Sequence, residues 1–163
     1  DLIISNFYLH LTNNFELLLN NIFRSLNKNG FFIATVPGIN CFNELKNSMM
    51  KADIELYQGA YKRFGDIFTV ETISNLLKIH NFKIPVLEID NIQLRYKTFN
   101  KLLDDVRNLG NSFNTFDRKK SFENHKYFKK VEEIYWENFS NKNEIILQLE
   151  LIYVSGWKEH RSK

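Results

Sequence analysis

The chain has 163 residues and a formal net charge of +3, with basic residues interleaved among nearly as many acidic ones. This length allows one domain with a sizeable core, which we assign to residues 1–163. The mild, dispersed charge argues against a nucleic-acid-binding face, where basic residues concentrate. The single cysteine, Cys41, excludes an internal disulfide and a Cys-pair zinc site, and the histidines show no metal-ligand spacing.

The first 40 residues predict a strand, a helix and a second strand. Residues 2–4 form an unbroken apolar run, which is typical of a parallel strand covered on both faces. Apolar residues then recur at helical spacing: Phe15, Leu18, Leu19, Ile22, Phe23 and Leu26. Thr12, Asn13 or Asn14 can cap this helix, and Gly30 is the expected left-handed residue after its end. A strand over 31–36, stopped by Pro37-Gly38, completes a βαβ unit with parallel strands and a right-handed crossover.

The remaining sequence continues the alternation. We expect helices over 41–57, 70–82, 99–109 and 121–139. Thr69 is the expected cap of the helix over 70–82, with a hydrophobic staple between Phe68 and Ile73. Gly110 ends the helix over 99–109, and Ser121 caps the helix over 121–139. Residues 86–96 predict one strand, or two short ones split at Asp90-Asn91, and residues 143–157 predict a long strand. Polar loops are expected at 59–68 and 111–120. The fold class is therefore α/β, with about four strands and about five helices.

Two regions follow from this topology as candidate sites. In open α/β sheets, ligands bind beyond the carboxyl ends of the strands, which points to residues 5–10 and 36–40. The longest apolar stretch, residues 145–154, is too short to span a bilayer and contains Gln and Glu. No secretory signal pattern stands at the front. We expect a chain without a membrane span, in the cytoplasm of a bacterium or in an organelle matrix of a eukaryote.

Several blocks of the sequence resemble a known family. DLIISNFYLHL, followed by LNKNGFFIATVPG, resembles the second half of the core of class I S-adenosylmethionine-dependent methyltransferases. GAYKRFGDIFTVETISNLLKIHNF and the closing IYVSGWKEH resemble a subgroup that holds mitochondrial complex I assembly factor 5 and its bacterial relatives. The biotin-pathway malonyl-acyl-carrier-protein methyltransferase is more distant. The resemblance covers nearly the whole chain and implies a partial Rossmann-like methyltransferase sheet.

The sequence also departs from the family pattern. Leu11 stands where the family has Trp, Asn29 replaces a Pro, and no glycine-rich strand-to-helix turn occurs anywhere in the chain. In the full fold such a turn and an acidic ribose-binding residue would precede Asp1. We therefore expect a C-terminal portion that lacks the cofactor-binding half. The intact family fold uses S-adenosylmethionine, whereas this chain alone is expected to bind none, and whether it is an enzyme stays open.

The resemblance assigns candidate site residues, each with a structural alternative. Near the methionine end of the cofactor it places Ser5, Asn6 and Phe7, and it makes His10 and Tyr8 candidates for catalysis. The alternative is a helix-entry loop with packed aromatic residues and a capping histidine. The candidate substrate-binding residues are Tyr61, Arg63, Arg95 and Tyr96. The alternative for the arginines is a solvated side chain that covers apolar surface.

The opening strand also predicts association. An apolar strand left at the edge of a sheet invites pairing with another chain, so we expect a homodimer or a swapped assembly at this edge. For function we expect a methyltransferase-like protein that acts in respiratory complex I assembly, where the family resemblance implies arginine hydroxylation on a protein substrate. The alternative is a non-catalytic degenerate or split-gene product that functions only by pairing with another chain.

Overall fold

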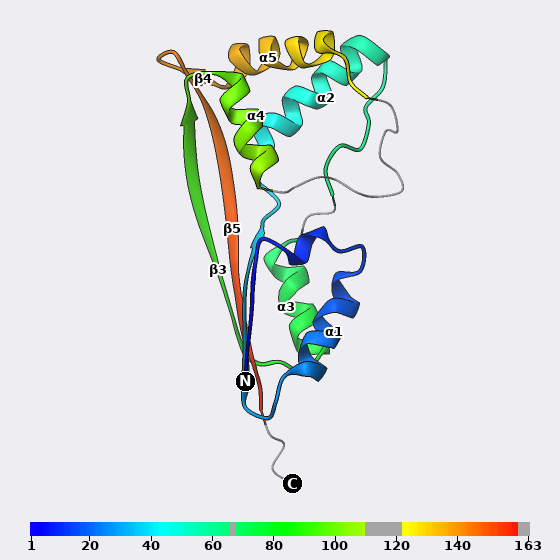
Figure 1. Ribbon diagram of the computed structural model, residues 1–163, viewed down its shortest axis with the longest axis vertical. Helices are drawn as coiled ribbons and strands as arrows, with labels where there is room; N and C mark the ends of the chain where they lie inside the picture. Colours follow the sequence, from blue (N-terminus) through cyan, green and yellow to red (C-terminus); the bar gives the residue numbers. More distant parts are fainter. Residues whose placement is uncertain (66–67, 110–121, 160–163) are drawn as a thin grey trace. The chain divides into compact units, whose positions relative to one another are not determined.

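The computed structural model describes residues 1–65, 68–109 and 122–159. The chain divides into two compact units. Unit 1 holds residues 1–41, 66–91 and 150–163, and unit 2 holds residues 42–65 and 92–149. The strand order is β1-β2-β5-β3, with β4 paired to β5 (Figure 1). Two long strands, β3 (Lys83–Tyr96) and β5 (Glu144–Lys158), contribute residues to both units.

Unit 1 begins with the predicted βαβ arrangement. β1 (Leu2–Asn6) pairs in parallel with β2 (Gly30–Pro37), and α1 (Phe15–Ser25) connects them after the short 3-10 helix η1 (Leu9–Leu11). The Asn14 side chain caps α1 by accepting a hydrogen bond from the Leu17 amide at 2.8 Å. β2 pairs antiparallel with β5 on its other side. The parallel β1–β2 pair confirms the prediction from the strand-helix-strand order.

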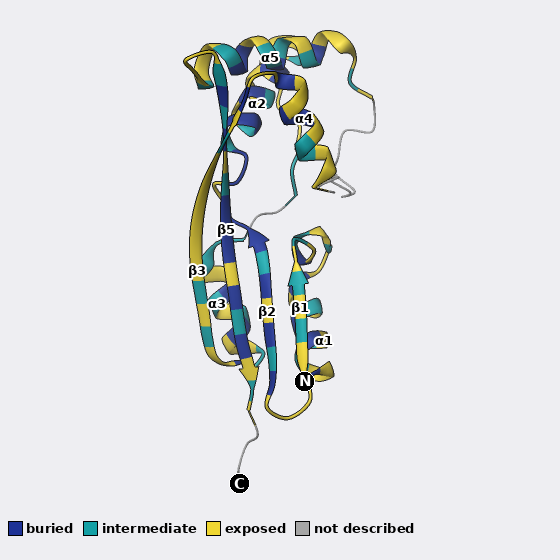
Figure 2. Cartoon of the chain, turned by 60° about the vertical axis from the view of Figure 1, so that its left-hand side comes forward, coloured by how far each residue is buried: buried dark blue, intermediate teal, exposed yellow. Residues whose placement is uncertain are grey.

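Two helices cover one face of the sheet in unit 1. α1 and α3 (Val70–Ile79) both lie against this face in Figure 1, and Figure 2 looks onto the opposite face. Thr69 caps α3 as predicted, and Phe68 stacks on Phe15 with ring centroids 4.2 Å apart. The core between helices and sheet contains, among others, Leu19, Phe32, Val36, Ile73, Leu77, Ile152 and Val154. Alternate strand residues therefore face the core, as the period of two requires.

Unit 2 is built mainly from helices. α2 (Asn43–Tyr57), α4 (Phe99–Asn108) and α5 (His125–Phe139) contribute to it, together with the hairpin of β4 (Ser140–Asn141) and the start of β5. The buried residues of α5 are Tyr127, Val131, Ile134 and Tyr135. Of the helices in the described part of the chain, none is long and apolar enough to cross a membrane.

The structure corrects two local predictions. The left-handed residue after α1 is Asn29, with φ 61°, whereas Gly30 is the first residue of β2. α5 begins at His125 and is capped by Asn124, so the predicted start of this helix at Ser121 is wrong. The described residues do not include Ser121, the predicted helix end Gly110 or the predicted loop 111–120. Leu2 and Ile4 of β1 are 55% and 67% exposed in the described chain. That the remaining cover of this strand belongs to a further half of the fold stays a prediction.

A buried phenol in unit 2 predicts loss of stability at alkaline pH. The fully buried Tyr135 hydroxyl donates a 2.7 Å hydrogen bond to the Ile146 carbonyl, and burial raises the pKa of Tyr135 above its ordinary value. The unfolded chain loses this proton first, near pH 10, so stability persists below about pH 10 and then falls by up to about 1.4 kcal/mol per pH unit.

Urea unfolding at pH 8 and at pH 10.5 tests this expectation. Trp157→Phe leaves Trp136, in α5, as the fluorescence reporter of unit 2. Tyr135→Phe loses the hydrogen bond but is expected to show a shallower decline between the two pH values, since it has no proton to release. Parallel pH dependence in the two proteins would contradict this account.

Candidate functional site

The carboxyl end of β1 gathers five of the predicted site residues. Ser5 is half-buried in the strand, and its Oγ is buried without a hydrogen-bond partner in the described part of the chain. Asn6 follows it on the exposed side. Phe7 leaves the strand with φ 51°, and its amide donates to the Thr35 carbonyl at 2.9 Å. The left-handed turn at Phe7 directs the chain out of the strand and into η1.

The last two of these residues follow directly. Tyr8 precedes η1 with its side chain 62% exposed, and His10 lies half-buried within η1. The Phe7 and His10 rings meet edge to face, with centroids 6.0 Å apart. Tyr8 is thus accessible to a ligand, whereas His10 contacts an aromatic ring of the same turn.

The loop after β2 is organised around a buried carboxylate that no sequence pattern indicated. Glu150 is only 7% exposed; its Oε1 accepts from the Asn40 amide at 3.2 Å and its Oε2 from Asn40 Nδ2 at 2.6 Å. Gly38 bonds the Glu150 carbonyl through its own amide at 2.8 Å. This loop lies at the carboxyl end of β2, where the topology rule places ligands. At this place Glu150 and Asn40 of the chain itself form hydrogen bonds with each other.

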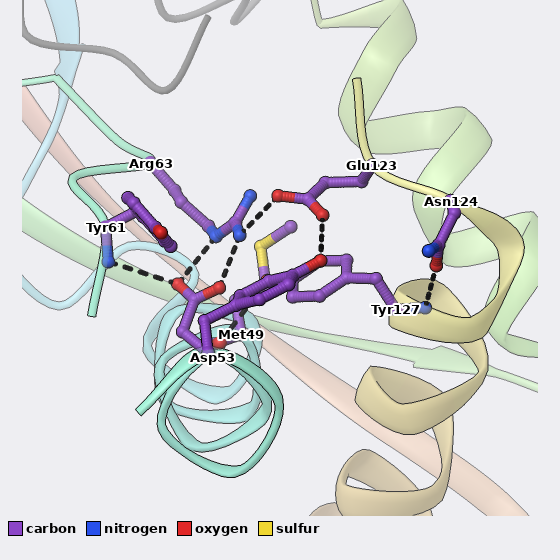
Figure 3. Close-up of polar contacts among 8 residues, drawn as sticks. Met49, Asp53, Tyr61, Arg63, Glu123, Asn124 and Tyr127 are labelled. Carbon is purple, nitrogen blue, oxygen red and sulfur yellow. Dashed lines mark hydrogen bonds and ion pairs between the residues drawn. The ribbon is translucent and has the colours of Figure 1, made fainter. Parts of the chain in front are cut away.

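Arg63 and Tyr61 belong to a polar cluster in unit 2 (Figure 3). The Arg63 guanidinium donates to both Asp53 carboxylate oxygens, with Nε at 2.8 Å from Oδ2, and to Glu123 Oε1 at 2.7 Å. Its Cζ lies 4.2 Å from the centre of the Tyr127 ring, a cation–π arrangement. The Tyr61 amide donates to Asp53 Oδ2 at 3.3 Å. These contacts fasten the loop after α2 to α2 and to the start of α5.

Burial makes these charges depend on one another. The side chains of Arg63, Asp53 and Glu123 are 12%, 0% and 9% exposed. Burial lowers the pKa of Arg63, but the hydrogen bonds to Asp53 and Glu123 outweigh it and raise the pKa above its ordinary value. For the Tyr127 phenol burial has the opposite effect and raises the pKa, because it disfavours the charged phenolate. Arg63 therefore stays charged and is held by two carboxylates of its own chain, which makes its main observed role structural.

Arg95 and Tyr96 end β3 on opposite faces of the strand. Arg95 is exposed, whereas Tyr96 is buried. Burial and a hydrogen bond to Asp105 of α4 raise the pKa of Tyr96. The residues predicted to bind cofactor lie in unit 1, and the four predicted to bind substrate lie in unit 2. Both assignments stay predictions.

Three of the interacting carboxylates carried no signal in the sequence pattern. Asp53 and Glu123 lie in expected helices and Glu150 lies in the expected strand over 143–157, and the spacing of their neighbours does not mark them as paired. In a sequence, a carboxylate that pairs with a distant cation or amide cannot be distinguished from a carboxylate that water solvates. Only the folded contacts distinguish them.

The strand ends fit S-adenosylmethionine in part. The unpartnered Ser5 hydroxyl, the exposed Asn6 amide and the exposed Tyr8 ring offer polar and stacking contacts to one end of such a molecule. The chain contains no glycine-rich strand-to-helix turn for the other end. These residues would contact such a molecule on one side only.

Comparison with curated proteins finds relatives that match the full chain. It is 28% identical over 165 residues to the mitochondrial arginine-hydroxylase NDUFAF5 of Dictyostelium discoideum, covering 38% of that protein. It is 26% identical to human NDUFAF5, covering 47%, and 22% identical to malonyl-[acyl-carrier protein] O-methyltransferase of Legionella pneumophila, covering 55%. The chain thus spans about half the length of the curated relatives it matches. No protein-family model matches it.

Solved structures share the fold of this chain, among them one that is described as a methyltransferase. A candidate methyltransferase from Bacillus halodurans superposes with a TM-score of 0.61 at 9% identity; the match covers 98% of this chain and 64% of that one. The YcgJ protein of Bacillus subtilis gives a TM-score of 0.56 at 11% identity with the same coverage. At such identities the likeness establishes the fold, which agrees with the class I methyltransferase resemblance in the sequence.

Proposed function

We propose that this chain contributes part of an S-adenosylmethionine site. The premise is that the chain is a relative of NDUFAF5 and malonyl-[acyl-carrier protein] O-methyltransferase with a methyltransferase-like fold. The contributing residues are Ser5, Asn6 and Phe7 at the carboxyl end of β1, with Tyr8 and His10 following. The observation that supports this most is the Ser5 hydroxyl, which is buried near the carboxyl end of β1 without a hydrogen-bond partner among the described residues. Buried polar groups normally have partners, so this one is suited to a ligand.

The activity that we carry over is the class shared by the relatives. Their names state arginine hydroxylation and methyl transfer to a malonyl group on acyl-carrier protein. We propose chemistry on a group borne by a protein, with complex I assembly as its setting and the mitochondrial matrix or bacterial cytoplasm as its place. Tyr61, Arg63, Arg95 and Tyr96 remain our candidates for contacting that protein. Of these, Arg95 and Tyr61 are the accessible ones.

We expect the chain alone to bind S-adenosylmethionine very weakly, with a Kd above about 1 mM. Specific sites bury most of a small ligand, and the residues of this chain supply contacts on one side only. Titration calorimetry with S-adenosylmethionine and S-adenosylhomocysteine measures this directly. Micromolar binding by the chain alone would contradict the one-sided site.

Complementation tests the role of the strand end. The chain is co-expressed with the part of the Legionella relative that it does not match, and the purified complex is titrated with S-adenosylmethionine. We expect binding that Ser5→Ala and Asn6→Ala each weaken by about tenfold, the loss of one hydrogen bond of about 1.4 kcal/mol. Thr12→Ala, which removes a hydroxyl bonded within its own turn to the Leu9 carbonyl, is the matched control. Binding unaffected by both strand-end variants would remove them from the site.

A second candidate function is non-catalytic. In it the chain acts only by pairing with another polypeptide. The exposed Leu2 and Ile4 on β1 favour this reading, since apolar side chains on an edge strand are a common feature of surfaces that pair.

A further inference from the structure

The carboxylate of Glu150 is held by neutral hydrogen bonds. Its two oxygens accept from the backbone amide and the side-chain amide of Asn40, at 3.2 and 2.6 Å. In the described part of the chain no lysine, arginine or histidine forms an ion pair with it. Glu150 is only 7% exposed, so the described residues themselves make up nearly all of its surroundings.

A buried negative charge without a cation destabilises a fold. Buried carboxylates are normally paired with a cation, and departures from this rule gather at functional sites. Anchoring the loop requires no charge, because the carbonyl oxygen of a glutamine could accept from the same two Asn40 donors. The charge of Glu150 is therefore the property that the loop structure alone does not explain.

Glu150 lies at the same end and on the same face of the sheet as Ser5. The Gly38 amide, directly after β2, donates to the Glu150 carbonyl at 2.8 Å, and β1 runs parallel to β2. Side chains alternate along a strand, so Glu150 projects on the face of Ile152 and Ser5 on the face of Ile3. Both apolar residues pack in the core of unit 1. A ligand at Ser5 is thus at the end of the sheet that carries this charge.

We propose that Glu150, positioned by Asn40, attracts the sulfonium group of S-adenosylmethionine bound at these strand ends. The inference rests on the proposed function and adds to that site a residue that selects the charge of the ligand. A sulfonium has no hydrogen to donate, so a negative charge is suited to recognise it. S-adenosylhomocysteine lacks the methyl group and is neutral at sulfur. Glu150 therefore favours the first molecule over the second.

The preference between the two ligands measures this attraction. Both are titrated by calorimetry into the complex of this chain with the unmatched part of the Legionella relative. Opposite charges about 12–15 Å apart, at an effective dielectric constant of about 20, change affinity by about fivefold to tenfold. We expect Glu150→Gln to weaken S-adenosylmethionine by this factor and S-adenosylhomocysteine by less than about twofold.

The matched control exchanges the two side chains' roles. In Glu150→Gln/Asn40→Asp the glutamine amide donates to a carboxylate at position 40, so the loop regains both its hydrogen bonds and its charge. We expect this pair to restore the preference for S-adenosylmethionine. Glu150→Gln/Asn40→Ser is a second neutral variant and should lose the preference, even if Glu150→Gln does not fold. Trp157 fluorescence in a Trp136→Phe background reports whether unit 1 is folded in each variant.

The outcomes separate this inference from the proposed function. If the neutral variants weaken both ligands equally, or neither, Glu150 acts through structure alone and the proposal is overturned. If Ser5→Ala and Asn6→Ala weaken binding while the neutral variants leave the preference unchanged, the proposed site stands and Glu150 is excluded from it. A complex that binds neither ligand contradicts the proposed site, and the assignment of Glu150 fails with it.

Discussion

Arg63→Ala is expected to lower the free energy of unfolding of unit 2 by about 3–5 kcal/mol, because it leaves two buried carboxylates without their cation. Asp53 is fully buried, and both Asp53 and Glu123 bond the Arg63 guanidinium directly. Removing Arg63 also takes away the cation over the Tyr127 ring. Urea unfolding followed by Trp136 fluorescence, in a Trp157→Phe background, measures the change in the unit that contains the cluster.

The control is a surface arginine. Arg107 pairs with Asp104 at 3.3 Å, but both side chains are about 60% exposed, so Arg107→Ala should cost at most about 1 kcal/mol. In a background of Asp53→Asn and Glu123→Gln, Arg63→Ala should cost much less than in the parent, since the uncompensated charges are gone. If Arg63→Ala in the otherwise unchanged protein lowers the free energy of unfolding as little as Arg107→Ala does, the two carboxylates do not depend on Arg63.

The second large effect is expected at Gly38. A Cβ there would lie 2.1 Å from Glu150 Oε1 and 2.8 Å from its Cγ and Cδ. Glu150 cannot swing away without losing its bonds to Asn40. We therefore expect Gly38→Ala to destabilise unit 1 by about 3 kcal/mol, from overpacking and from loss of charged hydrogen bonds. Trp157 fluorescence in a Trp136→Phe background reports this unit.

Gly59, in unit 2, provides the glycine control, because a Cβ there meets no atom within 4 Å; its stability is read from Trp136 fluorescence in a Trp157→Phe background. Gly59→Ala should change stability by less than about 0.5 kcal/mol. The steric cause is tested by Glu150→Ala, which empties the space: Gly38→Ala should then cost less than about 1 kcal/mol. An undiminished cost in that background would point to backbone conformation instead of the close approach.

Local order along the chain was predictable because it depends on nearest neighbours. The helical spacing of Phe15, Leu19 and Ile22 and the cap at Thr69 predicted α1 and α3, and both are confirmed. The parallel β1–β2 pair followed from a short strand-helix-strand order. Where local signals compete, as with Asn29 against Gly30 and Asn124 against Ser121, the predicted boundary was wrong by one and by three residues. Such boundaries depend on tertiary packing as well as on propensity.

The amino-acid sequence by itself determined the α/β order of elements, the residues that face the core and the resemblance to methyltransferases, since periodicity and motif blocks are local properties. Only the tertiary structure decided which polar groups are buried together: Arg63 with Glu123, 60 positions apart, and Asn40 with Glu150, 110 positions apart. A charged residue looks the same in a sequence whether water or a distant partner stabilises it. Burial excludes the water, and the fold brings the partner to within hydrogen-bond distance.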